Sequence, residues 1–141
     1  KLRTDGYIKA LLDNDIPFNE NLIIKIEDVD TCEITIGKLL EDKAINAVFA
    51  VNELFAVTII KTANKIGLNV PNDLAVIAFT DGMISKYSTP TITTISQRGE
   101  KMRNSAAKII IDRLESEDES EDENYITEVI ETYLVEREST S

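Results

Sequence analysis

The feature that most constrains the fold of this chain is an uninterrupted apolar run from Leu74 to Phe79, with turn residues on both sides. Gly67 and the Pro71-Asn72-Asp73 turn precede this run, and Thr80-Asp81-Gly82 follows it. A short run of this kind predicts a strand covered on both faces, which is typical of a parallel sheet between layers of helices. Ligands of open α/β sheets bind beyond the carboxyl ends of the strands, so the Thr80-Asp81 tip is the first candidate for a functional site.

Strand-like and helix-like segments alternate along the whole chain. Apolar residues at helical spacing predict helices over 1–13, 31–40 with Thr31 as the cap, 52–67 and 102–114. Short β-branched or apolar runs predict strands at 22–26, 45–51, 74–79, 91–95 and 131–136, with an irregular connection at 83–90. This alternation indicates an α/β fold: a doubly wound, mostly parallel sheet with helices on both faces.

Composition limits the partners that this chain can have. Its 141 residues suit about one domain of ordinary size. The net charge of −11 argues against direct binding to nucleic acid or to an anionic membrane, since both require a basic surface. There is no histidine and only one cysteine, Cys32, so an intramolecular disulfide is excluded and we expect no metal and no cofactor. The first residues show neither a signal peptide nor a membrane span, which predicts a cytoplasmic protein.

No catalytic constellation is visible, and we expect that the chain is not an enzyme. It has no glycine-rich phosphate loop, no nucleophile elbow and no histidine for proton transfer. Polar residues instead follow three predicted strands in turn: Asn52, Thr80-Asp81 and Ser96-Gln97. Carboxyl ends of parallel strands share one edge, and short hydrogen-bonding side chains there suit a ligand rich in hydroxyl groups.

Three of the candidate residues also have purely structural interpretations. Asn52 is a good N-cap for the helix that follows it. Asp81 before Gly82 can form an Asx turn, and Arg3 can be a solvated arginine on the first helix.

Several blocks in order carry a resemblance to a known family. They are Arg3, Gly6-Tyr7 and Ala10-Leu11, then AVFAVNE from Ala47 to Glu53, GLNVPNDLAVIAFTD from Gly67 to Asp81, YSTPTITTISQ from Tyr87 to Gln97, and VEREST from Val135 to Thr140. Together they strongly resemble the lactose/galactose repressor family of bacterial transcription regulators. The resemblance covers nearly the whole chain.

The resemblance implies the C-terminal part of an effector-binding domain with the periplasmic-binding-protein-like fold, whose cleft between two lobes holds a small ligand such as a sugar. It implies that effector-binding residues are Arg3, Asn52, Thr80, Asp81 and Gln97. This sequence departs from the family at Glu53, which replaces an aspartate, at Thr80, which replaces the ligand-facing aspartate, and at Arg103, which replaces a glycine. A threonine cannot hold two sugar hydroxyls as a carboxylate does.

The resemblance also divides the chain. Residues 1–96 and 128–141 are expected to form the C-terminal lobe, 98–115 a helix that packs on the N-terminal lobe, and 116–124 an acidic loop. The lobe's first strand would precede Arg3 and lie between 22–26 and 45–51, so a partner chain or upstream residues are expected to complete the sheet.

We therefore predict a ligand-sensing fragment of a regulator, binding a sugar-like effector and acting on DNA only through a helix-turn-helix domain outside this chain. The alternative is a periplasmic-type sugar-binding transport protein. A homodimer is expected, with Phe55, Met83, Ile84 and Tyr87 at its interface.

Overall fold

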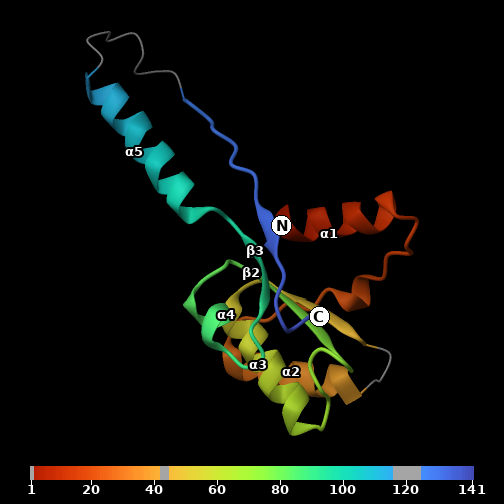
Figure 1. The fold of residues 1–141 in the computed structure, drawn as a ribbon. Coiled ribbons are helices and arrows are strands. Elements are labelled where there is room, and N and C mark those ends of the chain that lie inside the picture. The colour runs from red at the N-terminus through yellow and green to blue at the C-terminus, as the bar shows by residue number, and fades with distance from the viewer. Residues whose placement is uncertain (1, 42–44, 116–124) are drawn as a thin grey trace.

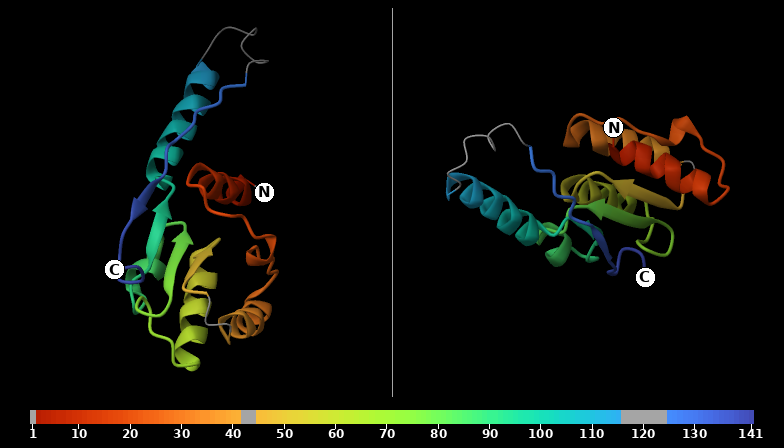
Figure 2. Two further views of the ribbon diagram at one scale, coloured as in Figure 1. Left: turned by 90° about the vertical axis from the view of Figure 1, so that its right-hand side faces the viewer. Right: turned by 90° about the horizontal axis from the view of Figure 1, so that it is seen from above.

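The structure is a computed structural model that describes residues 2–41, 45–115 and 125–141. A small sheet carries packed helices, one helix lies beyond the strand tips, and a long helix projects from the lobe (Figures 1 and 2). The elements in order are α1 (Leu2–Asp13), the 3-10 helix η1 (Glu20–Leu22), α2 (Val29–Glu41), β1 (Ala47–Ala50), α3 (Glu53–Lys65), β2 (Ala75–Phe79), α4 (Met83–Tyr87), β3 (Thr93–Ser96), α5 (Gly99–Glu115) and β4 (Tyr133–Val135).

The sheet has the strand order β1-β2-β3-β4. The first three strands are parallel, with Ala47 opposite Ala75 and Ile77 opposite Thr93, and β4 runs antiparallel to β3. The predicted mostly parallel α/β sheet is therefore confirmed. Its parallel strands place their carboxyl ends at one edge, which is the edge that α1 crosses (Figure 2).

The core lies between the sheet, α3 and α2. Helix α3 packs on β1 and β2, and α2 packs on α3. The residues buried there are Cys32, Ile36, Leu40, Ala50, Ala56, Ile59, Ile60, Ala63, Leu74, Val76, Ala78 and Ile92. Coverage of β2 is unequal, because Val76 and Ala78 are buried while Ala75, Ile77 and Phe79 are only half-buried. The apolar run thus forms the predicted strand, with one face more fully covered than the other.

Local signals fix the ends of α3 as expected. The Asn52 side chain accepts a hydrogen bond from the backbone N–H of Phe55 and begins the helix. Gly67 follows the helix with φ +83°, a left-handed conformation that glycine adopts without a steric penalty.

The predicted strand at 22–26 is wrong. Leu22 ends the 3-10 helix η1, which the side chain of Asn19 caps, and the residues after it form no strand. In the described part of the chain, the sheet ends at β1, so this β-branched segment has no neighbouring strand to satisfy its backbone groups. Leu22 and Ile24 remain exposed. Strand propensity without a partner does not make a strand.

Two further predictions need correction. Helix α2 begins at Val29, and its cap is Asp28, whose carboxylate accepts a hydrogen bond from Thr31 N at 2.7 Å. Thr31 is therefore inside the helix. The connection at 83–90 is not wholly irregular, because Met83–Tyr87 forms the short helix α4.

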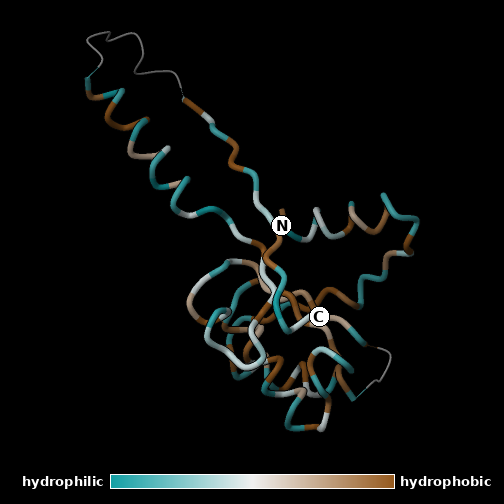
Figure 3. Tube along the Cα trace, in the orientation of Figure 1, coloured by the Kyte–Doolittle hydropathy of each residue, from teal (hydrophilic) through white to brown (hydrophobic). Residues whose placement is uncertain are grey.

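Helix α5 is the longest of the helices described and, like α1, has no buried residue. It projects from the lobe beside the segment that leads to β4, and apolar positions recur along both (Figures 1 and 3). Its exposed apolar residues are Met102, Ile110, Ile111 and Leu114. The predicted acidic loop at 116–124 lies outside the described residues.

The segment after β4 returns to the sheet. Ser139 is fully buried, its hydroxyl donates to the backbone oxygen of Val76 at 2.5 Å, and it accepts from Thr93 N at 2.9 Å. Its backbone N–H donates to Thr91 O, and its backbone oxygen accepts from Val76 N. Ser139 therefore joins β2 to the chain around β3.

Candidate functional site

The ends of β1, β2 and β3 bring together four of the five residues that the sequence predicted for effector binding. We call the surface formed by Arg3, Asn52, Thr80 and Gln97 the strand-tip surface. Helix α1 supplies Arg3. Thr80 and Gln97 directly follow β2 and β3, and Asn52 is the second residue after β1.

Arg3 is not a free surface arginine. Its Nη1 donates to the backbone oxygen of Val51 at 2.9 Å, and its Cζ lies 4.1 Å from the centre of the Phe79 ring. A guanidinium over an aromatic face gains a cation–π attraction. These two contacts hold α1 against the tips of β1 and β2, and Arg3 has further N–H groups that can donate to a ligand.

Asn52 fulfils the structural role that the sequence left open. Its Oδ1 accepts from Phe55 N at 2.9 Å, which caps α3. A carboxamide also carries two N–H donors on its nitrogen. No hydrogen bond from this nitrogen occurs within the described part of the chain, so capping and ligand contact are compatible at this residue.

Thr80 occupies a strained backbone conformation. Its φ is +84°, which is a genuine outlier for a β-branched residue and costs about 1 to 3 kcal/mol. The strand-tip contacts hold it there: Thr80 N donates to Ile95 O at 3.0 Å, and Gln97 Nε2 lies 3.4 Å from Thr80 Oγ1. Strain of this kind is common at ligand sites, where the surrounding structure imposes a particular side-chain direction.

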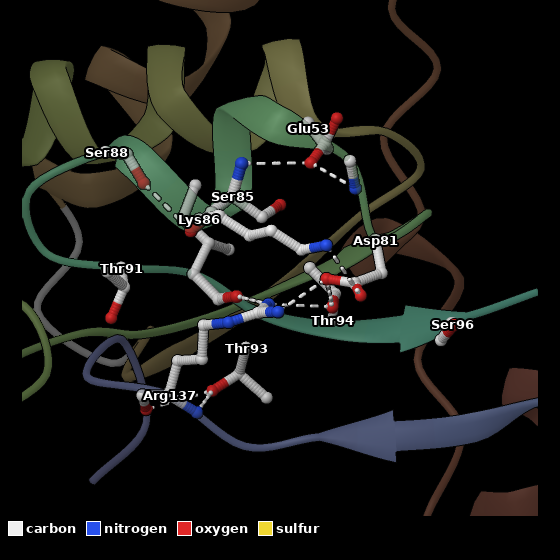
Figure 4. Close-up of polar contacts among 12 residues, drawn as sticks. Glu53, Asp81, Ser85, Lys86, Ser88, Thr91, Thr93, Thr94, Ser96 and Arg137 are labelled. Atoms are coloured by element: carbon white, nitrogen blue, oxygen red, sulfur yellow. Dashed lines mark hydrogen bonds and ion pairs between the residues drawn. The ribbon is translucent and has the colours of Figure 1, made fainter.

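Asp81 points away from this surface and into the lobe. Its Oδ1 accepts from Arg137 Nη2 at 2.6 Å and from Thr94 Oγ1 at 3.1 Å, while its Oδ2 lies 3.9 Å from Lys86 Nζ (Figure 4). Burial raises the pKa of this carboxyl, but the hydrogen bonds from Arg137 and Thr94 and the charges of Arg137 and Lys86 together lower it below its ordinary value. The Asp81 carboxylate therefore forms a largely buried ion pair with Arg137.

Arg137, the partner of Asp81, was not among the residues predicted for the site. Its backbone N–H donates to Thr93 Oγ1, and its Nη1 donates to Ile92 O at 2.8 Å and to Thr94 Oγ1 at 3.1 Å. It thus ties the segment after β4 to β3 and to Asp81. Only the rule that a largely buried carboxylate needs a cationic partner could have indicated it.

Glu53 is a second residue with an unexpected role. Its Oε1 accepts from the backbone N–H groups of Gly82 at 2.7 Å and Ser85 at 2.9 Å (Figure 4). Glu53 begins α3, whereas Gly82 and Ser85 belong to the start of α4. The side chain therefore bridges the two helix beginnings.

The four residues predicted for a dimer interface lie on α3 and α4, and we call them the α3–α4 surface. Met83 is 74% exposed and Tyr87 is 79% exposed, whereas Ile84 is less exposed and Phe55 is half-buried. A groove of about 530 Å³ lies between α3 and the residues directly after α4. It is lined by Val57, Ile60, Lys61, Asn64, Lys65, Ser88 and Thr89.

Metal-ligand clusters and membrane-spanning helices are both absent from the described residues. No group of three or more potential metal ligands occurs among them. None of the helices described is both long and apolar enough to span a bilayer.

Comparison with known proteins identifies the family. Residues 1–140 match the periplasmic binding protein-like domain. The HTH-type transcriptional regulator MalR of Clostridium butyricum is 37% identical over 140 residues, which is 97% of this chain and 40% of the relative. The chain belongs to the lactose/galactose repressor family.

Solved structures of this family share the fold. The transcriptional regulator CelR in a cellobiose complex superposes with a TM-score of 0.81 at 28% identity, over 97% of this chain and 41% of that one. A sugar-binding LacI-family regulator of Escherichia coli, complexed with phosphate, gives a TM-score of 0.81 at 26% identity, over 97% and 48% of the two chains. The chain spans about two fifths of the length of the MalR relative.

Proposed function

We propose that this chain is the ligand-sensing part of a LacI-type transcriptional regulator and binds a sugar-like effector at the strand-tip surface. The observation that carries the proposal is Thr80, held at a positive φ beside Gln97 on a surface that also presents Arg3 and Asn52. The regulator named CelR binds cellobiose on the same fold, which supports a sugar or sugar derivative as the ligand.

DNA binding would belong to a helix-turn-helix domain outside this chain, in a protein that acts in the cytoplasm. The net charge of −11 makes the chain itself unsuited to contact phosphates. The relatives named above are regulators, which favours this function over the transport protein that the sequence left open. Regulation by ligand binding requires no catalysis, so the proposed protein is not an enzyme.

Residues 98–115 would pack on a second lobe of the effector-binding domain, and residues 1–96 with 128–141 would form the lobe described here. Helix α5 buries none of its residues against the described part of the chain, although Met102 and Ile110 are apolar. A second lobe would cover such residues and would supply the other wall of the ligand cleft.

The α3–α4 surface would mediate a homodimer. Met83 and Tyr87 are large apolar residues exposed on one short helix, next to a groove along α3. An isologous contact places the same patch on both subunits, so Met83→Asp combined with Ile84→Asp should produce monomers in sedimentation experiments. A monomeric unmutated chain at high concentration would contradict the dimer.

Asn52→Asp tests the effector site without removing the helix cap. Aspartate retains an oxygen for Phe55 N and is equally favoured at an N-cap, but it lacks the N–H donors of the carboxamide. In a two-lobed protein that contains this chain, the variant should keep its thermal stability and respond less to mono- and disaccharides in operator-binding titrations. Asn21→Ala, in exposed η1, is the matched control and should respond normally.

Calorimetry of the chain alone provides the complementary measurement. One lobe offers only half of a cleft, so we expect weak or undetectable binding of monosaccharides. An unchanged response of the Asn52→Asp protein to every sugar that acts on the parent would overturn the assignment of this surface.

A further inference from the structure

The two turns that carry candidate ligand residues are joined by one side chain. Asn52 is directly followed by Glu53, and Thr80 is separated from Gly82 only by Asp81. The carboxylate of Glu53 accepts hydrogen bonds from Gly82 N at 2.7 Å and Ser85 N at 2.9 Å. The distance between the turn after β1 and the turn after β2 is therefore set by these bonds as well as by the sheet.

Gly82 makes this bridge possible. Its φ of −107° is open to any residue, so backbone conformation does not explain a glycine at this position. A Cβ atom placed on Gly82 would instead overlap the carboxylate of Glu53. The glycine leaves the space that the long glutamate side chain fills.

The bridge also reaches the α3–α4 surface. Ser85 is fully buried within α4, and its backbone N–H is held by Glu53, while Met83 and Ile84 of the same helix face outward. A movement of α4 would therefore be transmitted through Glu53 to the start of α3, where Asn52 lies.

We infer that Glu53 is a positioning residue for the strand-tip surface: it fixes Asn52 relative to Thr80 and links both to α4, and Gly82 is its required counterpart. This inference rests on the proposed function in one respect, namely that the strand-tip surface binds the effector. The positioning itself is a property of the described residues and can be measured without a ligand.

The test uses amide hydrogen exchange and backbone NMR spectra of the chain with four variants: Glu53→Ala, Glu53→Gln, Gly82→Ala and the Glu53→Ala/Gly82→Ala double variant. In Glu53→Ala, exchange of the Gly82 and Ser85 amides should accelerate by about tenfold or more, because both lose a charged acceptor. The Thr80 amide and Asn52 side-chain amide signals should shift. Glu53→Gln keeps an oxygen acceptor and should restore most of the protection.

Gly82→Ala separates positioning from a general loss of stability. With Glu53 present, the added methyl group displaces the carboxylate, so this variant should also lose protection at Ser85 and shift the signals of Asn52. In the Glu53→Ala background, the same methyl group meets no carboxylate and should add little further change.

Two results would overturn the inference. One is normal exchange at Gly82 and Ser85 in Glu53→Ala, and the other is an equal, additive effect of Gly82→Ala with and without Glu53. Failure of the proposed function would appear elsewhere, as an unchanged effector response in Asn52→Asp, while these exchange results stayed as predicted.

Discussion

Helices α3 and α5 both carry apolar residues at helical spacing, but their environments are opposite. Helix α3 buries six residues against β1, β2 and α2, whereas α5 buries none although it is longer. The comparison shows that an apolar stripe indicates a need for a partner and says nothing about whether the partner is present. Stability of the described lobe should come from α3, and α5 should contribute little to it.

The largest effect is expected from a matched pair of isoleucines. Ile59 on α3 is 3% exposed, and Ile110 on α5 is 60% exposed. Ile59→Ala should lower the free energy of unfolding by about 2 to 5 kcal/mol, because it creates a cavity. Ile110→Ala should change it by less than about 0.5 kcal/mol. Urea titration measures both, and equal losses would show that α5 is packed in solution.

Repeating this pair in a longer protein with a second lobe would sharpen the comparison. If the lobe covers α5 as proposed, the cost of Ile110→Ala should rise toward that of a buried site. An unchanged cost would argue against the packing of 98–115 on another lobe.

Arg137 and Lys65 compare an internal ion pair with an exposed one. Arg137 and Asp81 are 15% and 14% exposed, whereas Lys65 pairs with Glu33 at the surface. Arg137→Met leaves the Asp81 carboxylate largely buried without its cation and should cost about 3 kcal/mol. Lys65→Met should cost about 0 to 1 kcal/mol. Thermal unfolding at neutral pH distinguishes them, and a cost below that of Lys65→Met would refute the importance of the internal pair.

The pH dependence of stability follows from the lowered pKa of Asp81. A carboxyl group with a lower pKa in the folded state contributes stability that is fully present above its unfolded pKa of about 3.9 and is lost as the pH falls through the folded pKa. Asp81→Asn removes this contribution. Its stability should therefore decline less steeply in acid than that of the wild type, and parallel curves from pH 6 downward would count against the assignment.

Thr80→Gly should have a smaller effect on stability than Ile59→Ala or Arg137→Met, and in the opposite direction. Thr80→Gly removes the strain of the positive φ, but glycine also gives the unfolded chain more conformational entropy. Because the strain is the larger of the two contributions, the variant should stabilise the lobe by about 0.5 to 1 kcal/mol. Thr31→Gly, inside α2, should destabilise it by about 0.3 to 0.5 kcal/mol, the difference between the helix propensities of the two residues. Chemical denaturation measures both, and destabilisation by Thr80→Gly would show that the backbone at Thr80 is not strained.

Local features of the fold could be predicted from the sequence because the responsible residues are neighbours. The cap at Asn52, the end of α3 at Gly67 and the strand after the Pro71 turn each depend on a few adjacent residues, and all were confirmed. The family resemblance was confirmed by the comparisons. The positions of Asn52, Thr80 and Gln97 at one edge follow from parallel strands, whereas Arg3 lies on α1 and was predicted only through the resemblance.

Features that depend on distant residues could not be predicted in this way. Asp81 and Arg137 are separated by 56 positions, and nothing in either local sequence shows that they pair. The segment 22–26 has strand-like residues but no neighbouring strand, so it did not become one. Glu53 lies 29 positions from Gly82, and its role depends on how α3 and α4 approach each other.

The buried Ser139 determines when this lobe can finish folding. Its hydroxyl contacts Val76, which lies 63 positions earlier, and its backbone bonds join residues on both sides of the β2–β3 pair. During synthesis, β1, β2 and β3 leave the ribosome before this residue does, so their sheet must remain incomplete until the segment after β4 arrives. Translation itself therefore imposes a waiting period on this lobe, in which the site for Ser139 is open and the strands are exposed to other chains.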